Sequence, residues 1–303
     1  MGIGITLLII FLFFVIMLLF YGIAIEPHRF EVRRERAEIP HLPPAWEGKH
    51  IAVIGDFQLG MWLDNASTIR RIVHWLLREK PDIVLVLGDY IYHSARHPEK
   101  VMQDAVQLMS PLIEAGIPTY SVLGNHDFAM SAREDPVQED VAQTVRDGLH
   151  RLGITILHNS SILLDPASNQ SVDQDTLDEG LYLIGLGADY PQKDRPEVAL
   201  DGVPPSAPRI FIMHNPQSFK ALPANSAPLA VAGHTHGGQI CLPFLPNWSY
   251  LTPVLDLPDA DGWIEGYGKP GNHLFINRGV GFSAIPIRIN CPPEVTWFTL
   301  HKI

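Results

Sequence analysis

The chain has 303 residues, of which 46% are hydrophobic, and a formal net charge of −11 at pH 7. Its few arginines after the apolar N-terminus are interleaved with glutamates, so electrostatics give no reason to expect nucleic-acid binding. The two cysteines, Cys241 and Cys291, are too few for a disulfide framework, and the sequence leaves both their pairing and the redox compartment open.

The N-terminal segment is long and apolar. From Ile3 to Ile25 it is uncharged and dominated by Leu, Ile, Phe, Val and Met. A helix of this length spans about 35 Å, enough to cross the hydrocarbon layer of about 30 Å in a bilayer. A signal peptide usually has a basic start and a shorter apolar core. We expect residues 1–25 to be an uncleaved transmembrane anchor; the alternative is a signal peptide cleaved near Gly22-Ile23-Ala24.

The charges beside this segment predict its orientation. No Lys or Arg precedes the span, and four arginines follow it: Arg29, Arg33, Arg34 and Arg36. The interleaved glutamates count for little in the positive-inside rule. The rule therefore favours a cytoplasmic location for the rest of the chain.

The next residues, 26–48, are charged and then rich in proline, a composition that suits a semi-rigid spacer or an edge segment. We therefore divide the chain into an anchor (1–25), a connector (26–48) and one domain (49–303).

Short apolar runs alternate with helical patterns in the domain. The runs are mostly Val, Ile and Leu, as in buried strands: His50–Gly55, Asp82–Gly88, Thr119–Gly124, Leu181–Gly187, Ile210–Met213 and Leu229–Gly233. Apolar residues at helical spacing predict helices over 69–77, 101–113 and 141–152. This alternation predicts an α/β domain. The polar stretch Asp165–Gly180 is expected to join two strands of a hairpin.

Several apolar runs end in residues that bind metals. The endings are Asp56-Phe57-Gln58, Asp89, Asn125-His126-Asp127, His214 and His234-Thr235-His236. Ligands in open α/β sheets gather at the carboxyl ends of strands, so these five endings can converge on one crevice. Carboxylate, amide and imidazole groups without thiolate suit Mn, Fe, Zn or similar divalent ions.

Each ending has a simpler interpretation on its own. Ten of the 14 histidines have no motif around them and are expected to be ordinary polar residues. A lone His-x-His can be a structural accident, and Gly-Asn-His-Asp can be a polar turn. It is the occurrence of all five endings, in this order and after apolar runs, that indicates a metal centre.

With these motifs, the sequence resembles the calcineurin-like metallophosphoesterase superfamily from about Ile51 to the C-terminus. It is most similar to a membrane-anchored branch that carries GHTHGGQI, here Gly233–Ile240, and a late segment that here reads Arg278-Gly279-Val280-Gly281 and Pro293-Glu294. The resemblance implies a four-layer α/β/β/α sandwich of two mixed sheets flanked by helices, here preceded by the transmembrane helix.

The resemblance also implies a role for each motif residue. Two divalent ions (Mn, Fe, Zn or Mg) would activate a bridging hydroxide for phosphoester hydrolysis. Asp56, Gln58 and His236 would bind the first ion, Asp89 would bridge both, and Asn125, His214 and His234 would bind the second. His126 would act as a catalytic residue beside the scissile group, and Asp127 would orient it.

Two positions depart from the pattern of the family. Its first motif normally reads Asp-x-His, so Gln58 replaces an imidazole with a harder and usually weaker oxygen ligand, which favours Mn or Mg over Zn there. Tyr92 replaces a supportive aspartate. Arg278 is either a phosphate contact or a structural hydrogen-bond donor.

The substrate is not fixed by the motifs. The apolar loop 241–268, which includes Phe244, Trp248, Tyr250 and Trp263, is expected either to form a wall beside the metals or to pack on the core. Together with the anchor, a wall favours a lipid-linked phosphoester, and the resembling branch includes proteins associated with UDP-2,3-diacylglucosamine hydrolysis in lipid A synthesis. The alternatives are a broad phosphodiesterase or phosphatase on soluble esters, or a degenerate metal-bound scaffold. A metallo-β-lactamase-like site would need His-x-His-x-Asp-His, which the glycines after His236 exclude.

Overall fold

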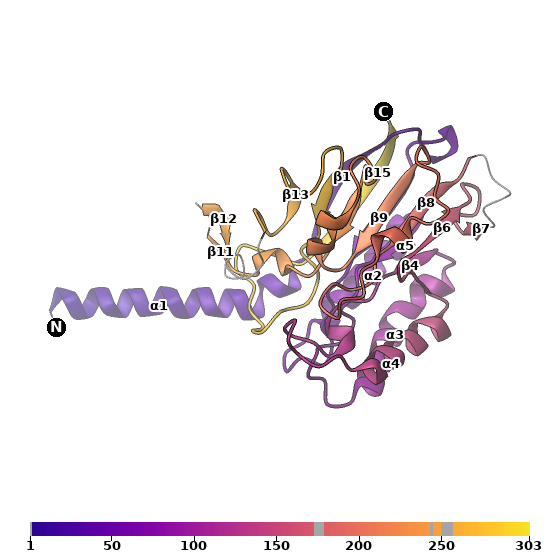
Figure 1. Ribbon diagram of the computed structural model, residues 1–303. Coiled ribbons are helices and arrows are strands. Elements are labelled where there is room, and N and C mark those ends of the chain that lie inside the picture. The colour runs from indigo at the N-terminus through magenta and orange to yellow at the C-terminus, as the bar shows by residue number, and fades with distance from the viewer. Residues whose placement is uncertain (1, 173–178, 243–244, 250–256) are drawn as a thin grey trace.

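The computed structural model describes residues 2–172, 179–242, 245–249 and 257–303, and residues 245–248 by their backbone alone. A long N-terminal helix, α1 (Ile3–Ala24), extends away from a body built around two β-sheets (Figure 1). A third, two-stranded sheet pairs β11 (Cys241–Leu242) with β12 (Leu245–Ser249), beyond the main body.

The first sheet has six strands in the order β1-β15-β2-β3-β4-β5. Their bounds are β1 (Glu31–Ile39), β15 (Glu294–Lys302), β2 (His50–Ile54), β3 (Ile83–Val86), β4 (Thr119–Ser121) and β5 (Thr155–Ile156). From β2 to β5 the strands are parallel, while β15 pairs with β2 antiparallel, so the sheet is mixed.

The second sheet has seven strands in the order β13-β14-β10-β9-β8-β6-β7. Their bounds are β13 (Gly262–Ile264), β14 (Leu274–Ile276), β10 (Ala230–Ala232), β9 (Arg209–Met213), β8 (Leu181–Gly185), β6 (Ser160–Leu164) and β7 (Ser171–Val172). Strands β8, β9, β10 and β14 run parallel, and the others pair antiparallel. As expected, β6 and β8 form antiparallel partners across the polar stretch, of which residues 173–178 lie outside the described part.

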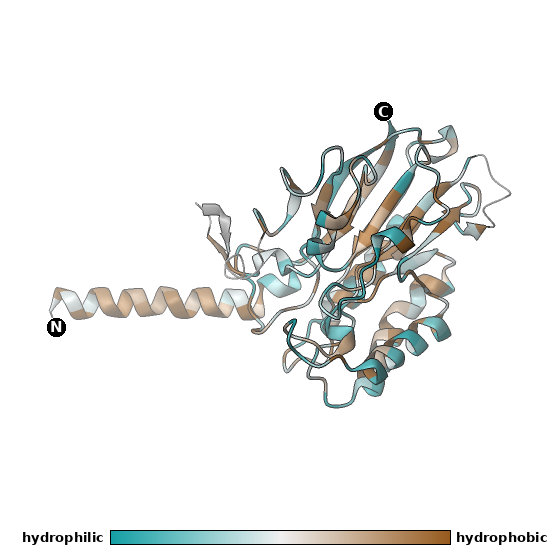
Figure 2. Cartoon of the chain, viewed as in Figure 1, coloured by the Kyte–Doolittle hydropathy of each residue, from teal (hydrophilic) through white to brown (hydrophobic). Residues whose placement is uncertain are grey.

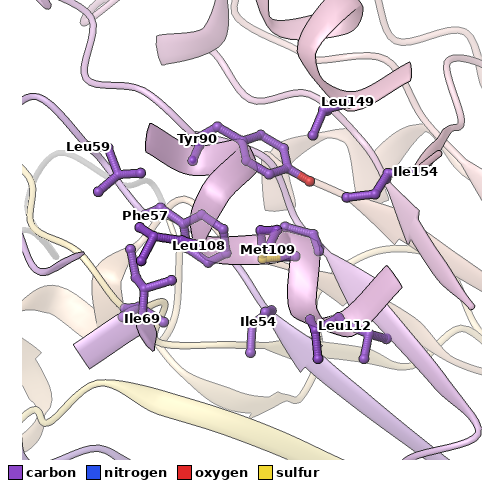
Figure 3. Packing of buried hydrophobic residues seen from close by; sticks show 14 of the residues in the cluster. Ile54, Phe57, Leu59, Ile69, Tyr90, Leu108, Met109, Leu112, Leu149 and Ile154 are labelled. Carbon is purple, nitrogen blue, oxygen red and sulfur yellow. The ribbon is translucent and has the colours of Figure 1, made fainter. Parts of the chain in front are cut away.

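Three helices cover the outer face of the first sheet: α2 (Ala66–Glu79), α3 (Pro98–Glu114) and α4 (Glu139–Leu152). Each is amphipathic, with its polar face outward (Figure 2). Their apolar faces pack on the sheet in a core whose centre includes Ile54, Phe57, Tyr90 and Met109 (Figure 3). The predicted helices therefore exist and extend by a few residues at their ends.

A second core lies between the two sheets and contains Leu85, Ile212, Phe275 and Phe298. A third lies on the outer face of the second sheet, under the short helices α5 (Pro196–Ala199) and η5 (Pro216–Ala221). The expected arrangement of two mixed sheets flanked by helices is confirmed. The helical layer over the second sheet is much thinner than that over the first in the part of the chain that the structure describes.

Residues 26–48, expected to be a connector, contain the 3₁₀ helices η1 (Glu26–His28) and η2 (Pro44–Trp46) on either side of β1. Strand β1 lies at the edge of the first sheet and pairs with all nine residues of β15, so the segment is more than a spacer. Glu31, Arg34, Arg36 and Glu38 are exposed. Arg33 and Glu35 are half-buried, on the same face of the strand as the buried Ala37 and Ile39. An edge strand of this composition resists further pairing because its exposed side chains are charged.

Helix α1 is the one helix among the described residues that is long and apolar enough to cross a membrane. No residue of its most hydrophobic window is buried by the rest of the chain, and Figure 2 shows it apolar along its length. A membrane span and a signal sequence both have this character.

Candidate metal centre

The expected metal ligands come from both sheets and meet at one edge. Asp56 and Asp89 follow β2 and β3, and Asn125 follows β4, all in the first sheet. His214 directly follows β9, and His234 and His236 follow β10 in the second sheet. Because the strands within each group are parallel, their carboxyl ends bring these residues together.

The backbone turns sharply at several of these positions. Positive φ values between 51° and 73° occur at Asp56, Gln58, Asp89, His234 and His236. Non-glycine residues avoid this left-handed region, and each such residue costs roughly 1–3 kcal/mol. Strain of this kind persists where the surrounding structure holds it, and here it directs side chains from separate strands into one buried site.

One group of donor atoms surrounds His214. Its Nδ1 donates to the carbonyl of Leu87 at 2.7 Å, which leaves Nε2 facing the site. Three further donor atoms lie within 3.2 Å of this Nε2: Oδ1 of Asn125 at 3.0 Å, Oδ2 of Asp89 at 3.2 Å and Nδ1 of His234 at 3.2 Å. We call these four residues the second donor group.

All four atoms of the second donor group carry lone pairs, so a positive charge is needed between them. Burial alone lowers the pKa of His214, but the Asp89 carboxylate outweighs it and raises this pKa to about 9. A divalent cation fits the same arrangement, because carboxylate, amide oxygen and imidazole are its usual donors.

The first donor group is Asp56, Asp89 and His236. One ligand atom from each lies within 4.8 Å of the others, and His236 Nε2 is 3.9 Å from Asp56 Oδ1. Asp89 also belongs to the second group, so the two groups share one carboxylate. Nδ1 of His236 is buried without a hydrogen-bond partner among the described residues.

The carboxylates of both groups are fully buried, which is costly without compensation. Burial raises the pKa of Asp56 to about 7, and the Asp89 carboxylate adds to this rise while His214 opposes it. Bound cations would remove this repulsion. The shared carboxylate and the chemistry of the donor atoms therefore both fit a pair of divalent ions.

Gln58 places its amide against Asp89, the carboxylate that both donor groups share. Its Nε2 donates to Asp89 Oδ2 at 2.7 Å, and its Oε1 is buried without a partner among the described residues. A half-turn of the amide would exchange these two atoms. Gln58 is thus placed either to support Asp89 or to offer an oxygen to a cation.

His126 lies beside the donor groups with its Nε2 3.9 Å from Asp89 Oδ2. The backbone N–H of His93 donates to His126 Nδ1 at 3.1 Å, and a backbone N–H can only donate. Nδ1 is therefore an acceptor, and the neutral ring carries its hydrogen on Nε2. Burial also lowers the pKa of His126 to about 4. The ring of Tyr92 stacks on it with centroids 5.4 Å apart.

The position of Asp127 corrects the role expected for it. Its carboxylate accepts from the backbone N–H groups of Gly124, Asp89 and Tyr90, each at 2.9 Å, and makes no hydrogen bond to the His126 ring. Asp127 thus joins the loops after β3 and β4, and it positions Asp89 through the backbone. His93 and Tyr92 hold the ring of His126 instead.

Four contributors to the site were not predicted from the sequence. His93 and Tyr92 lie in the loop after Asp89. Their nearness to that motif is the sequence feature that could have identified them. Tyr190 contacts His234, with its hydroxyl 3.2 Å from Nε2. No motif surrounds Tyr190, because it reaches the site only through the second sheet.

The fourth is Arg288, a fully buried arginine. Its guanidinium donates to five backbone carbonyls around the loop that carries His236: those of His236, Arg278, Gly279, Gly281 and Cys291. A lone arginine in a loop gives no sequence signal for this role.

Arg278, left open between two roles, is committed to carboxylates. Its Nε lies 2.7 Å from Asp261 and 3.6 Å from Glu294, and its Nη1 lies 3.5 Å from Glu31. These ion pairs hold the late glycine-rich segment against β1 and β15, so Arg278 has a structural role and not that of a free phosphate contact.

The aromatic loop after His236 is described only in part. Phe244 and Tyr250 lie outside the described residues, as does the side chain of Trp248. Trp263 packs against Phe275 and Phe298, with ring centroids 5.3 and 6.1 Å apart, so this tryptophan covers the core between the sheets and does not line the donor groups. Cys241 and Cys291 are free thiols that both contact the carbonyl of Gly237, at 3.2 and 3.1 Å.

Comparison with known proteins decides the family. Residues 49–238 match the family described as calcineurin-like phosphoesterase. The chain belongs to the calcineurin-like phosphoesterases. It is therefore a metallophosphoesterase, a hydrolase of phosphoester bonds, and both expectations from the motifs are confirmed.

Several curated calcineurin-like relatives match most of the chain. Phosphodiesterase YaeI of Escherichia coli is 30% identical over 74% of this chain and 72% of its own length. Uncharacterized metallophosphoesterase YkuE of Bacillus subtilis is 26% identical over 93% of this chain and 90% of its own length. UDP-2,3-diacylglucosamine pyrophosphatase LpxG of Chlamydia muridarum is 24% identical over 89% of both chains. Calcineurin-like phosphoesterases use dinuclear metal centres, and the two donor groups are the candidate ligands for one here.

Proposed function

We propose that this chain hydrolyses a lipid-linked phosphoester at the membrane surface with two divalent cations. Asp56, Gln58 and His236 would hold the first cation, and Asn125, His214 and His234 the second. Asp89 would bridge them. The observation that carries this assignment is the shared Asp89, because one buried carboxylate takes part in two groups of metal-binding atoms.

When bound, a pair of divalent ions supplies a nucleophilic hydroxide at neutral pH and neutralises charge on the phosphate. The protein supplies the orientation of its donor atoms. Leu87 fixes the tautomer of His214, and Asp127 holds the backbone of Asp89, so neither ligand has to reorganise when a substrate arrives.

His126 contributes a hydrogen-bond donor that is not needed for metal binding. With Nδ1 occupied by the His93 N–H, its Nε2–H is the atom available to the ester. In this position it can donate to the phosphate or to the leaving oxygen as charge develops there. Buried between Tyr92 and Asp89, the ring has little freedom to turn away.

The lipid-linked substrate rests on two observations. Helix α1 has the length and composition of a membrane span, which would tether the site to a bilayer with the domain in the cytoplasm by the positive-inside rule. One relative is named for hydrolysis of UDP-2,3-diacylglucosamine, a lipid-linked diphosphate. A water-soluble phosphodiester is the second candidate, because another relative is named simply as a phosphodiesterase.

The test is a hydrolysis panel with the purified full chain. Bis-p-nitrophenyl phosphate and a UDP-linked diacyl sugar in mixed micelles are each assayed with added Mn²⁺ and with EDTA. We expect metal-dependent turnover of both, with the higher kcat/KM on the lipid-linked ester. A preference for the soluble ester would refute the lipid substrate. If neither ester is turned over, the chain is a scaffold that has lost catalysis.

A further inference from the structure

The end of helix α1 is fixed to the domain. The carbonyl of Gly22 accepts the backbone N–H of Arg288 at 2.9 Å, and Gly22 is buried there. A Cβ on Gly22 would lie 2.7 Å from Cγ1 of Ile289, so this close approach requires glycine. Two residues after α1, buried Glu26 accepts the backbone N–H of Cys291.

The turn that follows is held as firmly. The carbonyl of Pro27 in η1 accepts from Asn65 Nδ2 at 2.8 Å and from Thr68 Oγ1 at 3.0 Å. Helix α1 is therefore not joined to the domain by a flexible tether. Its orientation to the domain is set by the side chains of Asn65 and Thr68, at the start of α2, and by the segment that contains Arg288.

A cavity of about 530 Å³ lies at this junction, within the range of about 300–1,000 Å³ typical of ligand pockets. Leu18 and Tyr21 of α1 line it together with the segment Ile240–Leu242. Figure 1 shows the β11–β12 hairpin on the same side of the domain as α1. The lining is mostly apolar and also includes Phe30, Ile289, Asn290 and Pro292.

The depth of this cavity indicates what fills it. Leu18 lies six residues before the end of α1 at Ala24, which is about 9 Å along a helix. If α1 spans the bilayer, Leu18 is inside the hydrocarbon layer and Tyr21 is near the interface, where tyrosine is favoured. With α1 placed in this way, the end of the cavity at Leu18 lies at the depth of acyl chains, and its charged end lies at the interface.

Three charged residues line the cavity: Glu26, Arg29 and Glu31. Of the two glutamates there, Glu26 is hydrogen-bonded to Cys291 and Glu31 is paired with Arg278. Arg29 is exposed, and no carboxylate of the described residues lies within 4.0 Å of its guanidinium. An arginine in this position suits the phosphate of a lipid head group.

We propose that this cavity binds one acyl chain of an anionic glycerophospholipid, with the lipid phosphate at Arg29. The proposal rests on the membrane span of the proposed function but not on hydrolysis. The bound lipid would seat the domain against the bilayer. It would hold Ile240, four residues after His236, at the membrane surface, and so place the metal centre beside it.

Photo-crosslinking tests this proposal. The full chain is reconstituted in nanodiscs of phosphatidylglycerol that contain a trace of phosphatidylglycerol with a diazirine in its acyl chain. After illumination, mass spectrometry of the intact chain and of its peptides gives the labelled sites. Leu18→Trp fills the cavity, whereas Leu19→Trp adds the same volume at a neighbouring α1 position that does not line it. Both leucines are exposed, so neither variant disturbs a core.

We expect labels within residues 240–242 and 289–292, reduced roughly tenfold by Leu18→Trp and unchanged by Leu19→Trp. Arg29→Gln should lower labelling by a phosphatidylglycerol probe and leave labelling by a diacylglycerol probe unchanged. No label in these segments, or equal loss in both tryptophan variants, would overturn the proposal. An intact mass that lacks α1 would also overturn the proposal. Turnover of bis-p-nitrophenyl phosphate, measured on the same samples, reports separately on the metal centre.

Discussion

The amide of Gln58 donates a 2.7 Å hydrogen bond to Oδ2 of Asp89, the carboxylate that the two donor groups share. A histidine at this position would turn toward the site as a nitrogen ligand, whereas glutamine meets Asp89 as a neutral donor. We therefore expect the first donor group, to which we assign Gln58, to be the weaker half of the centre. Glutamine at position 58 distinguishes this chain from the usual Asp-x-His pattern.

Gln58→His should strengthen this half of the centre. Imidazole is a better ligand than an amide oxygen for Zn²⁺. We therefore expect the affinity for the more weakly bound Zn²⁺ ion to rise about tenfold or more, and the affinity for Mn²⁺ to change less. Titration with a competing chelator measures this affinity. Gln58→Leu is the control for loss of the hydrogen bond to Asp89. An unchanged Zn²⁺ affinity in Gln58→His would mean that residue 58 does not contact the metal.

His126→Ala should remove the donor to the ester and leave the metals in place. We expect kcat to fall by roughly 10²–10⁴-fold with unchanged metal content, since His126 lies outside both donor groups. His74→Ala, on the exposed face of α2, is the control. Loss of metal along with activity would show that His126 is itself a ligand.

His93→Ala tests how His126 is held. The hydrogen bond that fixes its tautomer comes from the backbone N–H of His93, which the substitution keeps. We therefore expect a decrease in kcat of less than about tenfold, much smaller than that of His126→Ala. A loss equal to that of His126→Ala would make the His93 imidazole a reacting group in its own right. Steady-state kinetics on bis-p-nitrophenyl phosphate separates the two outcomes.

Arg288→Met should affect both stability and the metal centre. It leaves buried carbonyls without donors, which should lower the free energy of unfolding by about 3–5 kcal/mol, and it frees the loop of His236. Arg209→Met is the matched control, because Arg209 is also buried and also donates to backbone carbonyls, at the start of β9 and away from the site.

Both arginine variants should melt at lower temperature in a thermal unfolding assay, but only Arg288→Met should lose metal when folded. Equal metal content in the two variants would contradict the role of Arg288 in holding His236.

The sequence predicted the central part of the fold because its signals are local. Runs such as His50–Gly55 and Leu229–Gly233 are apolar, short and followed by ligand residues, and the structure has strands there. Strand β1 was not predicted, because its charged residues look like a connector. Its pairing with β15 depends on a partner more than 250 residues away, between Glu31 and Glu294.

For the site, sequence patterns predicted which residues meet but not what holds them. The ligand motifs follow strand ends, so their convergence could be inferred from topology alone. The hydrogen bonds of Asp127, the tautomer of His126 and the carbonyl contacts of Arg288 depend on loop geometry that no local pattern encodes. The ion pairs of Arg278 likewise join Glu31, Asp261 and Glu294, which are far apart in sequence.

The shared role of Asp89 is the central claim, and metal analysis of Asp89→Asn tests it most directly. Elemental analysis of the purified chain should find two divalent ions per wild-type molecule and fewer than one in Asp89→Asn, with turnover lost in parallel. Asp82→Asn, an aspartate before β3 outside both groups, should keep both ions. Retention of two ions in Asp89→Asn would contradict a bridging carboxylate and the dinuclear centre built on it.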